Sequence, residues 1–412
     1  MVTGKIAKTP RTMKAASLAE PVRTSDAPHP LPQHNAHFDR TALLLQGGGA
    51  LGAYQAGAYQ ALEESNILPN WVAGISIGAI NAAIIAGNAP GERVVKLRRF
   101  WEKITTPLFK PLMAWVDAFT QEGDRQHRLI NQLRAGQVLV RGAPGFFELR
   151  FPPPYVMPPG SVGATSFYDT SPLRETLLEL VDFDRINRHE LRFAVGAVNV
   201  RNGNFIYFDN KPGGAHVRPE HVMASGALPP GFPPVEIEGE FYWDGGLVSN
   251  APLQYVIDNR PGTDMLILQV DLFGARGAMP RTLFESAERE KDIRYSSRTR
   301  LNTDNFRRLQ ELRMSLHRLL EKLPKSLQED PDAKLLASAA NAEAVTIVHL
   351  IHRRKNSDSA SKDYEFSRHS MIEHWEAGRQ DVLHTLRHAE WIERCRPKSG
   401  VSIFDLTRDA ID

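Results

Sequence analysis

The first clear pattern along the chain is a short apolar run that ends in glycines and is followed by apolar residues at helical spacing. Residues 41–46, TALLLQ, predict a strand that is buried on both faces. A second run at residues 71–75, WVAGI, leads into a helix of small residues that ends near Gly87. The helix predicted between the two runs carries its apolar residues at Leu51, Tyr54, Ala58 and Leu62. Strand, helix, strand and helix in this order predict a parallel sheet with crossover helices.

Later patterns extend this predicted sheet. Residues 191–210, with a turn at 201–203, predict one hairpin, and residues 235–243 alternate like a second hairpin at an edge. Apolar runs at residues 263–273 and 344–353 predict two further strands, because such runs are typical of strands inside a sheet. The fold class that follows is α/β.

Helices dominate the predictions for the remaining segments. Ser171 as N-cap and Pro172 in the first turn predict a helix between the two groups of strands. Residues 301–323 predict a basic amphipathic helix, and residues 370–392 a closing helix. We expect one face of the basic helix to carry Phe306, Leu309, Leu312, Leu316, Leu319 and Leu320. The simpler interpretation is that this apolar face packs against the rest of the protein. The alternative is that it contacts a membrane or a partner.

These patterns divide the chain into three parts. Residues 1–39 are basic and rich in proline, which predicts a flexible tail. Residues 40–275 hold most of the predicted strands and form the expected catalytic domain, with a proline- and aromatic-rich insertion at about 105–165. Residues 276–412 form a mainly helical C-terminal extension.

The composition is that of an ordinary globular protein. The 412 residues are 42% hydrophobic, and their formal net charge of +2 gives no support to a nucleic-acid partner. A single cysteine, Cys395, cannot form an internal disulfide and suits a reducing compartment. We find neither the apolar core of a signal peptide nor a run of about 18 apolar residues. A cytoplasmic protein that can lie at the periphery of a membrane is therefore expected.

The glycines after the first strand match a nucleotide-binding pattern, but the second strand lacks the acidic residue that such a site requires. Gly47, Gly48, Gly49 and Gly52 fit G-x-G-x-x-G. A dinucleotide site also needs an acidic residue at the end of the second strand, to hold the ribose. That strand instead ends at Ile75 and Ser76, and no G-K-[ST] follows the glycines. The pattern therefore gives no reason to expect a nucleotide cofactor.

The second strand ends in a G-x-S-x-G pattern formed by Gly74, Ser76 and Gly78. Between a strand and a helix, this pattern is typical of a nucleophile elbow, where the serine takes strained backbone angles and its neighbours must lack side chains. The amides of Gly47 to Gly49, one strand away, could then stabilise an oxyanion formed on Ser76. A tight turn in which the glycines only permit close packing is the simpler alternative.

A serine nucleophile needs a base, and the chain offers two candidates. Asp244 follows a predicted strand in WDGGLVSNAP, with Gly245 and Gly246 behind it. Its carboxylate is a weak base at the usual pKa near 3.9, so burial would have to raise that pKa. The alternative is a Ser–Asp–His triad that uses His349 or His352.

Three motifs in this order resemble the patatin-like phospholipase family: QGGGALGAYQAG, GISIGAINAA and DGGLVSNAP. SGALPPGFPPV and YDTSPLRETL are also similar to the family's pattern, and the stretch after residue 280 resembles an extension of some bacterial members. The resemblance implies a three-layer α/β/α fold with a mostly parallel sheet. It also implies a Ser76–Asp244 dyad with an oxyanion hole at Gly47, Gly48 and Gly49, supported by Gly52, Gly74, Gly78, Gly245 and Gly246. Gln46 departs from many relatives, which have an acidic residue there.

The expected function is hydrolysis of an acyl ester through an acyl-enzyme, without a metal or cofactor. The resemblance narrows the class to a lipid acyl hydrolase of phospholipase A or lysophospholipase type. The predicted partners are a lipid or other acyl ester and a transient membrane surface. Two alternatives stay open: a lipid-binding or scaffold protein with a vestigial site, and an acyltransferase that uses the same dyad.

Overall fold

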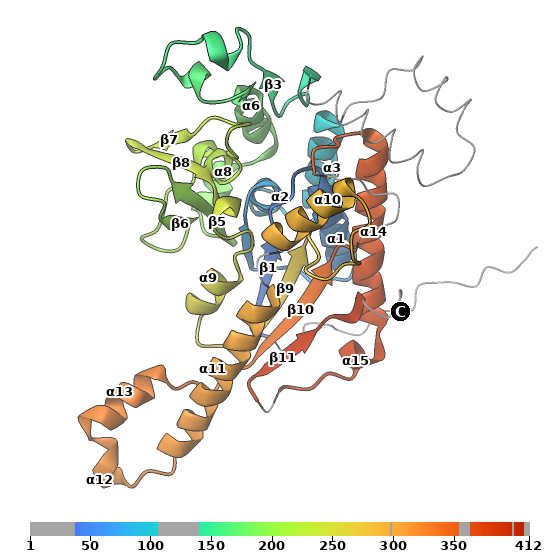
Figure 1. The fold of residues 1–412 in the computed structure, drawn as a ribbon. Coiled ribbons are helices and arrows are strands. Elements are labelled where there is room, and N and C mark those ends of the chain that lie inside the picture. The colour runs from blue at the N-terminus through green and yellow to red at the C-terminus, as the bar shows by residue number, and fades with distance from the viewer. Residues whose placement is uncertain (1–37, 106–139, 297–298, 354–362, 398, 408–412) are drawn as a thin grey trace, which may run out of the picture. The chain divides into compact units, whose positions relative to one another are not determined.

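A nine-stranded mixed sheet forms the centre of the computed structural model, which describes residues 38–105, 140–296, 299–353, 363–397 and 399–407 (Figure 1). The strands lie in the order β11-β10-β9-β1-β2-β5-β8-β7, and β6 also pairs with β5. The pairs from β11 to β5 are parallel, whereas β6, β7 and β8 pair antiparallel. This is the mostly parallel α/β fold that the sequence predicts.

The described elements alternate between strands and helices over the first half of the chain. The strands are β1 Arg40–Leu45, β2 Trp71–Gly74, β3 Glu148–Leu149, β4 Tyr168–Asp169, β5 Arg192–Asn199, β6 Phe205–Asp209, β7 Val235–Ile237, β8 Glu240–Asp244, β9 Met265–Asp271, β10 Val345–Ile351 and β11 Val401–Phe404. The helices are α1 Gly52–Glu64, α2 Ile77–Ala86, α3 Arg93–Ile104, α6 Ser171–Leu180, α7 Phe183–Asn187, α8 Pro219–Ser225, α9 Leu253–Asp258, α10 Leu283–Tyr295, α11 Thr299–Leu320, α12 Lys325–Gln328, α13 Pro331–Ala339, α14 Arg368–Arg387 and α15 Ala389–Ile392. The helix predicted from Ser171 is α6, although its N-cap is Thr170.

Helices cover both faces of the sheet, because successive side chains of a strand point to opposite faces. In β1, Leu43 and Leu45 belong to a core that includes side chains of α1, α2, α3 and α14. Ala42 and Leu44 belong to a second core, which includes side chains of α9 and α11. The result is the three-layer α/β/α arrangement that the resemblance implies.

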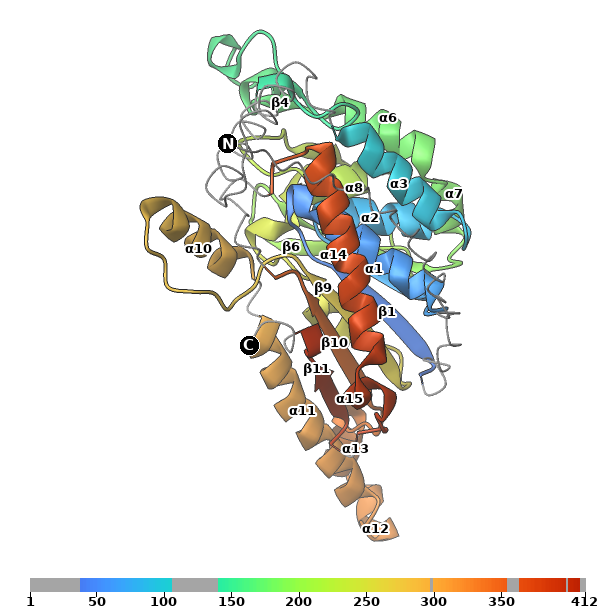
Figure 2. The ribbon, with the colours of Figure 1, turned by 90° about the vertical axis from the view of Figure 1, so that its right-hand side faces the viewer.

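The sheet continues across the predicted boundary at residues 275 and 276. The run at 344–353 forms β10, which pairs with β9, and β11, which we did not predict, pairs with β10. The closing helix α14 packs along α1, as Figure 2 also shows. The C-terminal region is thus mainly helical, and it also supplies one edge of the sheet.

Two sequence predictions fall partly outside the described residues. The tail predicted at 1–39 lies there up to residue 37, and the insertion predicted at 105–165 lies there from 106 to 139. Residues 34–412 group as one unit, to which every described residue belongs. Within the described ranges, no helix is both long enough and apolar enough to cross a membrane.

Candidate active site

Ser76 occupies a strained turn between β2 and α2. Its backbone has a φ of 56° and a ψ of −125°, angles that a serine rarely adopts. A Cβ at Gly74 would lie 2.2 Å from the carbonyl oxygen of Gly78, and a Cβ at Gly78 would lie 2.2 Å from that of Leu45. The turn therefore has the positive φ, and the need for glycine on both sides, that the G-x-S-x-G pattern predicts.

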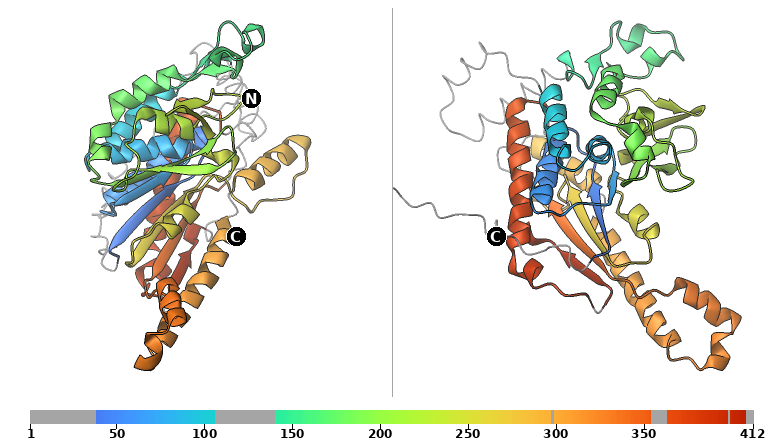
Figure 3. Two further views of the ribbon diagram at one scale, coloured as in Figure 1. Left: turned by 90° about the vertical axis from the view of Figure 1, so that its left-hand side faces the viewer. Right: turned by 180° about the vertical axis from the view of Figure 1, so that it is seen from behind.

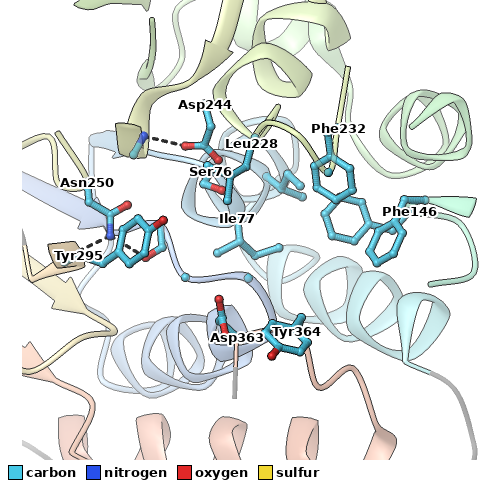
Figure 4. A pocket seen from close by; sticks show the side chains of 18 of the residues that line it. Ser76, Ile77, Phe146, Leu228, Phe232, Asp244, Asn250, Tyr295, Asp363 and Tyr364 are labelled. Atoms are coloured by element: carbon cyan, nitrogen blue, oxygen red, sulfur yellow. Dashed lines mark hydrogen bonds between the residues drawn. The ribbon is translucent and has the colours of Figure 1, made fainter. Parts of the chain in front are cut away.

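The strand order brings Asp244 to Ser76. Gly74, the last residue of β2, pairs with Val195 of β5. Asp244, the last residue of β8, pairs with Ala197, two residues further along β5. Strand β6 pairs along the opposite edge of β5. Strand β8 therefore pairs along the same edge of β5 as β2 does, beyond the point where β2 ends. The two side chains consequently lie together just beyond the end of β2 (Figure 4).

Asp244 is held in an environment that favours its protonated form. The residue is 2% exposed. Burial raises the pKa of its carboxyl group to about 6, because the charged form loses its water. Hydrogen bonds from the Ser76 side chain and from the Gly246 amide, at 2.7 Å, oppose this effect and lower the pKa. A general base at this position would need an increase in pKa of this kind.

The glycine-rich turn after β1 lies on the other side of Ser76. A Cβ at Gly47 would lie 3.1 Å from the Cβ of Ser76. The Gly47 amide donates to the carbonyl oxygen of Asn250 at 3.2 Å. In the described part of the chain, no hydrogen bond is found from the amides of Gly48 and Gly49. The Gly47 amide is thus already bound, and Gly48 and Gly49 are glycines of the same turn that line the cavity beside Ser76.

Asn250 links the glycine turn to the C-terminal region, a role that the sequence did not indicate. Its Nδ2 donates to the carbonyl oxygens of Gly47, at 3.0 Å, and of Tyr295 in α10, at 2.9 Å. Gln46 adds a second link, because its Oε1 accepts from the amides that follow β9 and its Nε2 donates to Tyr295. The available sequence signal was the position of Asn250 within DGGLVSNAP.

Further contacts fix the backbone around the serine and the glycines. The Ser76 amide donates to both the carbonyl oxygen and the Oγ of Ser225, each at 3.1 Å. Gly49 has a φ of 55°, and the Ala50 amide beside it donates to the carbonyl oxygen of Asp363 at 2.7 Å. Asp363 also pairs with Lys291 of α10, at 2.5 Å. The C-terminal region therefore fixes one side of the glycine turn.

The other predicted glycines support the same turns. Gly52 begins α1, and a Cβ there would lie 2.6 Å from Ile77. Gly245 lies against the carbonyl oxygen of Gly196 in β5. Gly246 donates its amide hydrogen to Asp244. Each of the predicted site residues therefore lies at the serine, at the aspartate or at the glycine turn.

Ser76 and Asp244 open into an apolar cavity of about 340 Å³. Gly47, Gly48 and Gly49 also line this cavity. One wall is aromatic and includes Phe146, Phe147, Tyr168, Phe232 and Phe366. The cavity has further walls at Tyr295, Asp363 and Tyr364, which belong to the C-terminal region (Figure 4). The sequence assigned no role to that region, yet it encloses part of the site.

Neither histidine of the alternative triad lines this cavity. His349 lies in β10, where its Nδ1 is 3.9 Å from Asp271. The ring of His352 packs edge-on against that of Tyr54. Across the described ranges, we find no group of three or more His, Cys, Asp or Glu side chains arranged to hold a metal ion. Asp244 is thus the titratable group beside Ser76 in the cavity.

Comparison with family models identifies the family. A model described as patatin-like phospholipase matches residues 43–257, which is more than half of the chain. A second model, described as patatin phospholipase, matches residues 293–398. The chain belongs to the patatin-like phospholipase family.

Individual relatives match short stretches. Patatin-like phospholipase domain-containing protein CNBE2340 of Cryptococcus neoformans is 30% identical over 115 residues, 28% of this chain and 13% of that protein. Triacylglycerol lipase SDP1L of Arabidopsis thaliana is 44% identical over 48 residues, 12% of this chain and 6% of that protein. Human patatin-like phospholipase domain-containing protein 6 is 36% identical over 72 residues, 18% of this chain and 5% of that protein. The chain thus spans a small part of the length of these relatives.

Two solved structures are distantly similar. VipD from Legionella pneumophila aligns with a TM-score of 0.34 and 14% identity, over 84% of this chain and 66% of that chain. The ExoU–SpcU complex of Pseudomonas aeruginosa aligns with a TM-score of 0.26 and 20% identity, over 74% of this chain and 60% of that chain.

Proposed function

We propose that this protein hydrolyses the ester bonds of lipids, with Ser76 as the nucleophile and Asp244 as the general base. Membership of the patatin-like phospholipase family supports a lipid ester hydrolase in general. The observation that carries the proposal for these residues is the contact between Ser76, on its strained turn, and a buried aspartate inside an apolar cavity. Perturbed carboxyl groups in clefts are typical of catalytic sites.

The first half of the reaction uses Asp244 as a base. With a pKa of about 6, its carboxylate is mostly ionised at neutral pH and is a better proton acceptor than an ordinary aspartate. Ser76 Oγ attacks the ester carbonyl carbon and gives its proton to Asp244. The tetrahedral intermediate then loses the alcohol, which takes that proton, and the acyl group stays on Ser76.

The oxyanion of this intermediate is stabilised by backbone amides. We assign this role to Gly48 and Gly49, because the Gly47 amide is already bound to Asn250. The N-terminus of α2, which begins directly after Ser76, adds a favourable dipole. One such donor typically contributes about 10²–10³ in rate.

The second half of the reaction releases the acid. Asp244 takes a proton from water, the hydroxide attacks the acyl carbonyl, and Ser76 leaves with the proton from Asp244. These steps use only side chains and backbone of this chain. The aromatic wall supports an acyl chain in the cavity, and the finer assignment to phospholipase A or lysophospholipase action rests on the family.

The test compares the wild type with Ser76→Ala on p-nitrophenyl esters from acetate to palmitate. Loss of turnover in Ser76→Ala is expected, while Ser171→Ala, at the start of α6, is expected to keep the wild-type rate. A new ester formed when glycerol or a lysolipid is added would reveal acyl transfer. Equal rates in the wild type and Ser76→Ala, or no turnover in either, would contradict the proposal.

A further inference from the structure

Helix α11 has two different faces, and one of them anchors it to the body of the protein. Phe306, Gln310 and Met314 are buried. Gln310 donates to Asn341 at 2.6 Å and to the carbonyl oxygen of Glu343 at 2.8 Å, just before β10. The sequence predicted that Phe306 and the leucines share one face. The structure separates them, because Phe306 packs under the sheet while most of the leucines face outward.

The outward face carries a leucine repeat. Its positions alternate in steps of three and four, at Leu309, Leu312, Leu316 and Leu319, and the same spacing reaches Leu323 just beyond the end of the helix. None of these residues is buried, and Leu312 and Leu319 are 68% and 59% exposed. This spacing is the a/d pattern by which one helix packs against another. Among the described residues, α13 contacts α11, but most of this leucine surface stays exposed.

The segment after α11 is also uncovered. Residues 321–339, which include α12 and α13, contain no buried residue, and Leu335 is 69% exposed. Leu327 and Leu336 are exposed as well. Helices of 4 and 9 residues are marginal in water unless an apolar face is packed. We call α11, α12 and α13 together, residues 299–339, the helical arm (Figure 3).

The two halves of the helical arm differ in charge. Arg308 and Arg313 flank the leucines at helical spacing, whereas Arg307 and Arg318 lie on the far side of the helix. Residues 324–339 carry Glu329, Asp330 and Asp332 against Lys325 and Lys334, and Glu329 pairs with Lys334 at 2.7 Å, so the tip has a small net negative charge. Two α11 helices facing each other would bring like charges together, which disfavours that pairing. The surface of α11 is instead complementary to the tip of another arm.

A lipid surface fits the helical arm less well. Basic and acidic side chains are nearly equal in number between Asp304 and Lys334, so the arm as a whole does not attract anionic lipid. Its anchor at Gln310 lies at the amino ends of the strands, whereas the cavity lies at their carboxyl ends. Figures 1 and 2 both show α12 and α13 at the opposite end from α6. A membrane bound by the arm would be a strand length away from the cavity.

We propose that the helical arm pairs with the arm of a second copy of this chain, so that α11 of each copy covers α12 and α13 of the other. Such a contact is two-fold symmetric, because the same surface serves both copies. It buries the leucines of both halves and pairs the α11 arginines with the acidic tip. The inference stands apart from the proposed esterase activity, since none of its residues lines the cavity.

The test uses a charge swap in the full chain. Arg308→Glu with Arg313→Glu, and separately Glu329→Lys with Asp332→Lys, are each expected to weaken dimerisation about 100-fold or more. An equimolar mixture of the two variants should restore a dimer, since it holds only opposite charges at both contacts. Light scattering coupled to gel filtration, over about 1 to 100 μM, measures the mass.

Two further measurements keep the outcome decisive. Circular dichroism and ester hydrolysis show whether each variant is folded, because the cavity is remote from the changes. A wild type that is monomeric throughout, variants that stay dimeric, or a mixture that stays monomeric would overturn the proposal. A monomeric wild type that sediments with anionic phospholipid vesicles, and loses this with Arg308→Glu and Arg313→Glu, would identify lipid as the occupant instead.

Discussion

The two ends of the central sheet carry different kinds of energetically unfavourable feature. At the carboxyl ends of the strands, Ser76 holds a φ of 56° and Asp244 is an almost fully buried carboxyl group. At the amino ends, the helical arm has regular helices but exposes Leu312, Leu319 and Leu335. The unfavourable features at the first end are a strained backbone and a buried carboxyl group. At the second end the unfavourable feature is apolar surface exposed to water.

This difference separates two kinds of function. Backbone strain and a buried charge cost stability and persist only where the surrounding structure holds them, as around a catalytic group. An uncovered apolar face leaves the backbone relaxed, and it is typical of a surface that associates. Changes at the first end should therefore alter chemistry and pH dependence. Changes at the arm should alter association and leave chemistry unchanged.

The largest effect is expected for Asp244→Asn. The asparagine can still accept the hydrogen bond from the Gly246 amide, but it cannot take the proton of Ser76. A general base typically contributes about 10²–10⁴ in rate, so kcat/KM on a p-nitrophenyl ester should fall by that factor. His352→Ala should keep most of its activity as long as it folds, because this histidine does not line the cavity. The reverse pattern would favour the histidine triad and contradict the dyad.

The same substitution should increase stability at alkaline pH. Burial raises the pKa of the folded Asp244 from 3.8 to about 6, so its ionised form destabilises the fold above pH 6 and has no such effect once both states are protonated. Asp244→Asn should add about 3 kcal/mol to the free energy of unfolding at pH 8, and this gain should shrink towards pH 4. Urea unfolding at several pH values measures it.

A second buried aspartate supplies the control. Asp209 pairs with Arg192 at 2.7 Å, so Asp209→Asn should lower the free energy of unfolding, because it leaves the guanidinium without its partner. Equal effects of the two substitutions, or a gain for Asp244→Asn that does not depend on pH, would show that the Asp244 charge is not costly.

A smaller effect is expected at Asn250. Asn250→Ala removes the hydrogen bonds that Asn250 donates to Gly47 and to Tyr295, so kcat should fall about 10- to 100-fold while KM changes little. Asn250→Asp should not restore kcat, because a carboxylate oxygen would face two carbonyl oxygens. Steady-state kinetics separates kcat from KM. An unchanged kcat with a lowered Tm would limit Asn250 to a structural role.

The parts of the site that the sequence predicted are those with a local physical cause. Gly74 is needed because a Cβ there would meet the backbone of Gly78 in the same turn, and Gly78 is needed because a Cβ there would meet the end of β1 at Leu45. Asp244 carries a similar signal in the glycines behind it. In both cases the signal is a short motif of adjacent residues, although some of the backbone that it fits belongs to a neighbouring strand. The roles of Asn250 and Asp363 could not be predicted in this way, because their partners are far away in the chain.

The C-terminal region shows the same limit for the fold. The periodicity of α11 predicted a helix, and the structure confirms it. The assignment of Phe306 to the face of the leucines was wrong, because amphipathic spacing alone does not tell which of two apolar faces meets the body. The strand β11 is short and lies at the sheet edge, so its pattern was too weak to predict.

The smallest effect is expected when the leucines of the arm are changed. Leu312→Ser with Leu319→Ser removes two exposed apolar side chains that lie a strand length from the cavity, so kcat/KM should stay within about twofold of the wild type. The stability of the isolated monomer should also change little, since these side chains have almost no buried contacts to lose. Ester hydrolysis and urea unfolding, both at protein concentrations below any dimerisation, measure the two quantities. A fall in kcat/KM as large as that of Asn250→Ala would mean that the two ends of the sheet are coupled. That result would contradict the idea that one end of the sheet serves catalysis and the other serves association independently.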